Sequence, residues 1–225
     1  MNMLHVKAFA GLLLLFVAMA ALLFGPARTA DYWQAWIFLA VYFAASLALT
    51  LYLMIADPAL LERRMRGGPT AETQPVQKII MIIASLGFVG LLVVPAFDHR
   101  FGWSQMPPAV ALVGDGLVGI GWLAIFFVFR ENSFTSSTIE LAPDQKVVSS
   151  GPYALVRHPM YAGALVMLLG IPIALGSWWG ILVLAAILPA LIWRLLEEEK
   201  FLAGNLAGYV EYQNKVRYRL IPAVW

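Results

Sequence analysis

Cysteine is absent from this chain, and charged residues are scarce. None of the 225 residues is a cysteine, and only 12% are charged. The lack of thiols excludes disulfides, thiolate zinc sites, iron–sulfur clusters and a cysteine nucleophile. No glycine-rich nucleotide loop and no histidine pair at metal-binding spacing is present, so we expect no metal site. The net charge of +2 is too small to indicate a nucleic-acid partner.

Long apolar runs dominate what is present. Hydrophobic residues make up 61% of the chain, and its mean hydropathy of +0.79 lies far from that of a soluble domain. Since about 20 apolar residues cross a hydrocarbon layer of roughly 30 Å, these runs predict membrane helices. Four of them cover residues 8–25, 32–56, 77–97 and 109–130. The first run could instead be a signal peptide, because Lys7 precedes it, but it is long for that purpose.

A fifth apolar run, residues 160–193, is too long for a single span. Four residues that break helices interrupt it: Gly170, Pro172, Gly176 and Gly180. We therefore predict a tight helical hairpin with arms of about 15 residues, or about 22 Å each.

These segments predict an all-α, polytopic membrane protein with five to six transmembrane helices, including the C-terminal hairpin. We expect one integrated domain. In it, residues 1–130 supply the N-terminal helices, and residues 131–225 form the catalytic region with the hairpin and the tail.

The basic residues predict the orientation in the membrane. With a cytoplasmic N-terminus, only Arg28 and Arg100 of the fifteen lysines and arginines would lie outside. This places both termini and the polar segment 131–158 in the cytoplasm. The compact length suggests a bacterial inner-membrane protein. In the connector 57–76 we interpret three arginines as topology determinants near lipid phosphates: Arg63, Arg64 and Arg66.

A polar motif stands at the start of the fifth apolar run, with Tyr153 and then Arg157-His158-Pro159-Met160-Tyr161. Its simplest interpretation is a helix start, since proline is favoured at the first helical position. The free N–H groups of such a helix also suit an anionic ligand, and Arg157 would add a charged fork. The sequence leaves both interpretations open.

Arg194 and Glu198 lie four residues apart and therefore share a helix face. They belong to a helix end with three consecutive acidic residues, Glu197 to Glu199, which in the simplest case is only solvated. Acidic groups at a helix C-terminus oppose the helix dipole, so at least one of them is expected to have another partner. A carboxylate suits ribose hydroxyls, and an arginine suits a substrate carboxylate or phosphate.

Together these residues resemble the isoprenylcysteine carboxyl methyltransferase and phospholipid methyltransferase superfamily. The resemblance rests on the motif of residues 151–163, on Arg194 with Glu198-Glu199, and on the tail from Gly208-Tyr209 to Pro222. It covers roughly residues 130–225. It implies an integral membrane enzyme that binds S-adenosylmethionine at the cytosolic membrane face, releases S-adenosylhomocysteine and takes a lipophilic acceptor from the bilayer.

The resemblance also implies roles for individual residues. Arg194 would orient a substrate carboxylate, and Glu199 could serve as a base for an amine acceptor. Gln145 stands where a histidine is common in the family, and the spacing from Glu198-Glu199 to Tyr209 looks one residue short. The expected cofactor contacts are Gln145, Lys146, Val147, Val148, Tyr153, Arg157, His158, Pro159, Met160, Tyr161 and Glu198.

The expected reaction is carboxyl O-methylation of an isoprenylcysteine-like or other lipid carboxylate, because such an acceptor needs no general base. One alternative is phospholipid N-methylation. Another is an NADPH-dependent membrane reductase of the sterol-reductase type, which would want an additional basic cluster. The expected partners are the lipophilic acceptor and membrane lipids; the sequence does not predict an oligomeric state.

Overall fold

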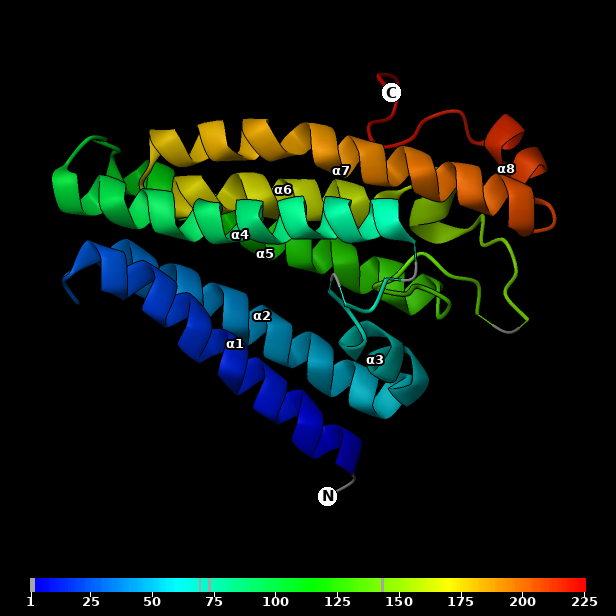
Figure 1. The fold of residues 1–225 in the computed structure, drawn as a ribbon, viewed down its shortest axis with the longest axis horizontal. Coiled ribbons are helices and arrows are strands. Elements are labelled where there is room, and N and C mark those ends of the chain that lie inside the picture. Colours follow the sequence, from blue (N-terminus) through cyan, green and yellow to red (C-terminus); the bar gives the residue numbers. More distant parts are fainter. Residues whose placement is uncertain (1–2, 69, 73, 143) are drawn as a thin grey trace.

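The computed structural model describes residues 3–68, 70–72, 74–142 and 144–225, and these residues form helices and no strands. The long helices run side by side along the longest axis of the molecule (Figure 1). The helices are α1 (Met3–Ala27), α2 (Trp33–Ala56), α3 (Pro58–Met65), α4 (Pro75–Phe101), α5 (Pro108–Glu131), the 3-10 helix η1 (Gly151–Ala154), α6 (Pro159–Ala174), α7 (Trp178–Asn205) and α8 (Tyr209–Lys215).

Five of the described helices, α1, α2, α4, α5 and α7, are long and apolar enough to cross a membrane, and α6 is a shorter apolar helix. The predicted all-α, polytopic membrane fold is therefore confirmed. Because the long helices alternate in direction, α3, the segment 132–158 and α8 gather at the end of the bundle that holds the N-terminus (Figure 1).

The predicted C-terminal hairpin is present as α6 and α7, and the expected arm of about 15 residues is met by α6 but was wrong for α7. The arms have 16 and 28 residues. Of the four predicted helix breakers only Gly176 lies in the turn, where its φ of +74° suits a residue without a side chain.

The other two predicted glycine breakers, Gly170 and Gly180, are packing sites, and this explains why they do not break the helices. A Cβ on Gly170 would lie 2.7 Å from the carbonyl oxygen of Gly114 in α5. A Cβ on Gly180 would lie 2.6 Å from the Cβ of Pro172. In membranes small residues let helix backbones approach closely, so a glycine inside a transmembrane helix can serve helix packing without ending the helix.

Polar contacts fix the end of the bundle opposite to α3 and α8. The Tyr32 hydroxyl donates to the carbonyl oxygen of Leu175 at 2.7 Å. The buried Asp98 carboxylate accepts from the backbone N–H of Ser104 at 2.6 Å and from the hydroxyl of Ser177. These bonds tie α4 and the loop after it to the hairpin turn, which sets the position of α7 along the bundle.

Candidate active site

A cavity of about 700 Å³ lies where α3, the segment 132–158 and the start of α8 meet. Residues from the N-terminal part (1–130) and from the C-terminal part (131–225) line it. The residues that the sequence singled out and that line the cavity are Gln145, Lys146, Val147, Val148, Tyr153, Arg157, His158, Pro159, Met160, Tyr161, Arg194 and Glu198. The volume falls in the range of roughly 300–1,000 Å³ that is typical of ligand and cofactor sites.

Glu198 and two tyrosines form the polar side of the cavity. The Tyr161 hydroxyl donates to Oε2 of Glu198 at 2.6 Å, and Asn132 Nδ2 donates to the Tyr153 hydroxyl at 3.0 Å. Burial raises the pKa of Tyr153 by more than the Asn132 hydrogen bond lowers it, so this phenol remains protonated at neutral pH. The cavity therefore offers a carboxylate next to a neutral aromatic ring.

The segment Gln145–Val148 has no regular secondary structure and forms one wall of the cavity. The side-chain oxygen of Gln145 accepts from the backbone N–H of Ala142 at 2.9 Å. The side chain of Val147 packs against the buried rings of Tyr209 and Tyr212. Sequence reasoning did not name these two tyrosines as site residues, although both line the cavity.

Glu199 does not line the cavity, unlike the other predicted site residues. Its side chain is buried, with 5% of the residue exposed, and it binds three basic side chains, which we call the Glu199 network. Arg157 Nε donates to Oε1 at 2.6 Å, Arg219 Nε donates to Oε2 at 2.8 Å, and His158 Nε2 lies 3.2 Å from Oε1. A carboxylate held by two arginines behind the cavity wall has no geometry for the expected role of a base.

The Glu199 network also attaches the C-terminal tail to the start of α6. The backbone N–H groups of Arg157 and His158 donate to the carbonyl oxygens of Tyr218 and Arg219, both at 2.9 Å. Arg157 Nη1 donates to the carbonyl oxygen of Val216 at 3.0 Å. The donors of Arg157 thus point mainly at the protein, and Pro159 stands at the first turn of α6, so the motif is a helix start whose arginine and histidine hold the tail.

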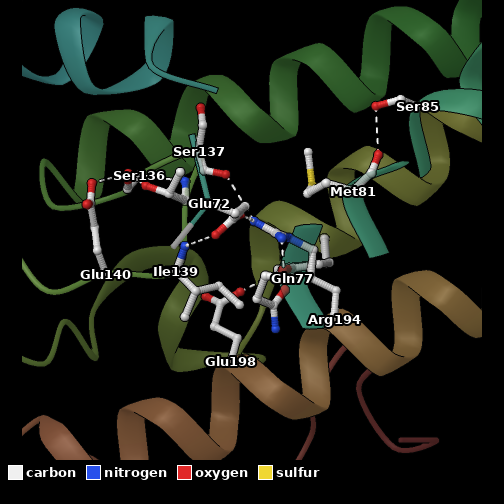
Figure 2. Close-up of polar contacts among 12 residues, drawn as sticks. Glu72, Gln77, Met81, Ser85, Ser136, Ser137, Ile139, Glu140, Arg194 and Glu198 are labelled. Atoms are coloured by element: carbon white, nitrogen blue, oxygen red, sulfur yellow. Dashed lines mark hydrogen bonds and ion pairs between the residues drawn. The ribbon is translucent and has the colours of Figure 1, made fainter. Parts of the chain in front are cut away.

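Arg194 reaches from α7 toward the loop before α4 (Figure 2). Its Nη2 donates to Oε1 of Glu72 at 2.7 Å and to the carbonyl oxygen of Ser137 at 3.0 Å, and its Nη1 donates to Oε1 of Gln77 at 3.0 Å. Glu72 and Arg194 are both buried, with 3% and 8% of each residue exposed. The charge that the sequence assigned to a substrate carboxylate is therefore neutralised by a carboxylate of the protein.

Arg64 also lines the cavity, and sequence reasoning missed it. The arginines of the connector 57–76 were interpreted as topology determinants only, but the connector contains α3, which Asp57 caps by accepting from the N–H of Leu60 at 2.9 Å. Arg64 Nη1 donates to the carbonyl oxygen of Ser136 at 2.7 Å, and its guanidinium lies 5.0 Å from the centre of the Phe129 ring. The Asp57-Pro58 pair is a recognisable helix-start signal and could have revealed α3.

The remaining walls of the cavity are apolar and come from α6 and the five membrane-spanning helices of the described residues. They include Leu49 of α2, Trp122 and Ile125 of α5, and Leu168 of α6. Leu15 of α1 also contributes, and 36% of this residue is exposed. The cavity thus joins a polar end to an apolar side that is lined by the membrane-spanning helices.

A family model matches part of the chain. Residues 110–207 match the family model described as phospholipid methyltransferase. No curated protein matches the chain. The matched region contains almost all of α5, the polar segment, α6 and the whole of α7, and hence most of the polar walls of the cavity. Residues 110–207 are therefore similar to the phospholipid methyltransferase family, which is part of the isoprenylcysteine and phospholipid methyltransferase superfamily of integral membrane proteins.

Proposed function

We propose that this protein is an S-adenosylmethionine-dependent membrane methyltransferase that methylates the carboxylate of a lipophilic acceptor, either isoprenylcysteine-like or another lipid acid. The observation that carries the proposal is the single cavity with two kinds of wall. One side presents Glu198, Tyr153 and the segment Gln145–Val148, and the other side is apolar and extends to Leu15 of α1.

The polar side fits the cofactor. Tyr161 binds one oxygen of Glu198, and no hydrogen bond to the other oxygen occurs within the described residues, so that oxygen can accept from ribose hydroxyls. The backbone groups of Lys146 to Val148 make no backbone hydrogen bond to another described residue, and they offer donors and acceptors for the edge of an adenine ring. The neutral Tyr153 adds an aromatic surface.

When bound, the sulfonium cofactor supplies an electrophilic methyl group. The protein then has to hold the acceptor oxygen in line with that group and keep water out, since positioning dominates such a displacement. The apolar wall around Trp122 and Ile125 would hold the acceptor's tail and exclude water. A carboxylate acceptor is already a nucleophile and needs no general base.

Phospholipid N-methylation is the second candidate, favoured by the description of the matching family. An ammonium acceptor must lose a proton before it can attack. Of the groups that could take the proton, Glu199 binds Arg157 and Arg219, and His158 lies against Glu199. The available oxygen of Glu198 is the one that we assign to the ribose of the cofactor. This arrangement favours carboxyl O-methylation.

We infer that the site faces the cytoplasm of a bacterial inner membrane, with both termini on that side. The support is the distribution of basic residues, since the end of the bundle that bears α3, the segment 132–158 and α8 carries most of them. An active site on this side would have access to a cytosolic cofactor.

Calorimetric titration of the detergent-purified protein with S-adenosylmethionine, S-adenosylhomocysteine and NADPH tests the proposal. We expect saturable binding of the two adenosyl ligands and none of NADPH. Glu198→Gln should weaken binding by about 10-fold or more, because a hydrogen bond to a charged group contributes about 1.5–3 kcal/mol. Glu197→Gln is the matched control, since Glu197 does not line the cavity. Binding of NADPH alone would contradict the proposal.

A further inference from the structure

We propose that Arg64 of α3, and not Arg194, binds the anionic group of the lipophilic acceptor. This inference rests on the proposed function and names a residue that determines its acceptor specificity. Both arginines line the same cavity, and they differ in what their guanidinium groups already bind.

Arg194 is engaged by the protein on three sides. Glu72, Gln77 and the carbonyl oxygen of Ser137 accept from its two terminal nitrogens. A substrate carboxylate that replaced Glu72 would leave that side chain as a buried charge without a partner, which is strongly unfavourable. Arg194 is therefore a positioning residue that joins α7 to the start of α4 and to the segment containing Ser137.

The guanidinium of Arg64 has fewer partners than that of Arg194 within the described residues. No carboxylate of the described residues lies within ion-pair distance of its guanidinium, and its one hydrogen bond from Nη1 goes to the carbonyl oxygen of Ser136. A guanidinium has five N–H donors, so a fork suited to a carboxylate or a phosphate remains. The Phe129 ring at 5.0 Å supports the flat group from one side.

The surroundings of Arg64 favour an anionic partner. Burial lowers the pKa of Arg64, which means that the cavity solvates this cation less well than water does. The charges of Arg194 and Glu198 also act on Arg64, and this places it beside the polar side of the cavity. An acceptor anion would supply the counter-charge that Arg194 receives from Glu72.

The position of Arg64 also matches the geometry of a lipid. Helix α3 lies at the end of the bundle that, in the proposed orientation, faces the lipid headgroups of the cytoplasmic leaflet (Figure 1). Leu53 of α2 and Leu61 of α3 line the cavity at this end of the bundle. Leu49 continues the apolar wall along α2. A lipid with its anionic group at Arg64 could extend its tail along this wall.

The test compares anionic and neutral amphiphiles of the same shape. The carboxylate pair is N-acetyl-S-farnesylcysteine and its amide, and the phosphate pair is dioleoylphosphatidate and dioleoylglycerol. Their dissociation constants are measured on detergent-purified protein loaded with S-adenosylhomocysteine, for the wild type and for Arg64→Gln, Arg64→Lys and Arg66→Gln. Arg66→Gln is the matched control, because it removes the same charge two residues along the chain. The side chain of Arg66 is 70% exposed.

In the wild type we expect one anion to bind about 10- to 100-fold more tightly than its neutral partner, as a charged hydrogen-bonded pair implies. The pair that shows this preference identifies the headgroup as carboxylate or phosphate. The preference should fall to near unity in Arg64→Gln and persist in Arg66→Gln. Arg64→Lys should reduce it several-fold, since lysine keeps the charge and loses the fork.

An unchanged preference in Arg64→Gln, or no preference in the wild type for either pair, would overturn the assignment of Arg64. If Arg64→Gln loses affinity for S-adenosylhomocysteine through misfolding, the lysine variant decides: normal cofactor affinity with an undiminished anion preference overturns the assignment. Failure of the wild type itself to bind S-adenosylhomocysteine would instead refute the proposed function.

Discussion

Glu199→Gln should lower the stability of the protein while leaving its chemistry intact. The substitution preserves the shape of the side chain but removes the charge that Arg157, His158 and Arg219 share. Breaking a buried ion pair by removing one partner costs about 3–5 kcal/mol, because the other charge remains buried without compensation. Arg219 is partly exposed and can turn to water, so the lower end of that range, about 3 kcal/mol, is the better expectation.

For a chain of this length, 1 kcal/mol shifts the melting temperature by about 2–4 °C, so we expect a decrease of about 6–12 °C. Thermal unfolding followed by tryptophan fluorescence in detergent measures it, with Glu197→Gln as the control. Turnover per folded molecule, measured well below the melting temperature, should stay within a few-fold of the wild type. A normal melting temperature combined with lost turnover would refute this reasoning and return Glu199 to the chemistry.

Three further predictions concern neighbouring features. Glu72→Leu should destabilise the protein by about 3–5 kcal/mol, because it leaves Arg194 buried without a counter-charge. The double variant Glu72→Leu/Arg194→Leu should recover part of this loss in the same thermal unfolding assay. Arg194→Ala should spare the affinity for S-adenosylhomocysteine in calorimetry but impair turnover by displacing the loop that carries Glu72; normal turnover would contradict a positioning role. Gly114→Val should prevent close packing of α5 and α6, since even a Cβ would lie 2.1 Å from the backbone nitrogen of Ala174. Gly116→Ala should be tolerated, because nothing lies within 4 Å of a Cβ at that position. Equal expression and equal melting temperatures for the two variants would contradict this packing.

The membrane helices were predictable from the sequence because each crossing needs a long apolar run, and such runs are visible without knowledge of their neighbours. The hairpin was predictable for the same reason, since the run 160–193 exceeds one span. The length of its second arm was not, because a glycine that ends a helix and a glycine that packs against another helix look alike in sequence. Gly176 is of the first kind, and Gly170 is of the second.

The polar side of the site was largely predictable, because its residues cluster in one segment and at one helix end. The sequence could not show which charges pair. Glu72 and Arg194 are 122 residues apart, and nothing in the connector marks Glu72 as a partner. Glu198 and Glu199 are adjacent, but successive helical residues point about 100° apart, so only Glu198 faces the cavity. Pairing and direction depend on tertiary packing.

The central claim is tested most directly by methyl transfer in proteoliposomes. Purified protein, S-[methyl-³H]adenosylmethionine and N-acetyl-S-farnesylcysteine or phosphatidylethanolamine are incubated, and label in the organic phase is counted before and after mild alkali. The account predicts label on the carboxylate acceptor that alkali releases as methanol, as expected of a methyl ester, and a strong loss of label in Glu198→Gln but not in Glu197→Gln. No transfer to either acceptor, or transfer that does not depend on Glu198, would contradict it.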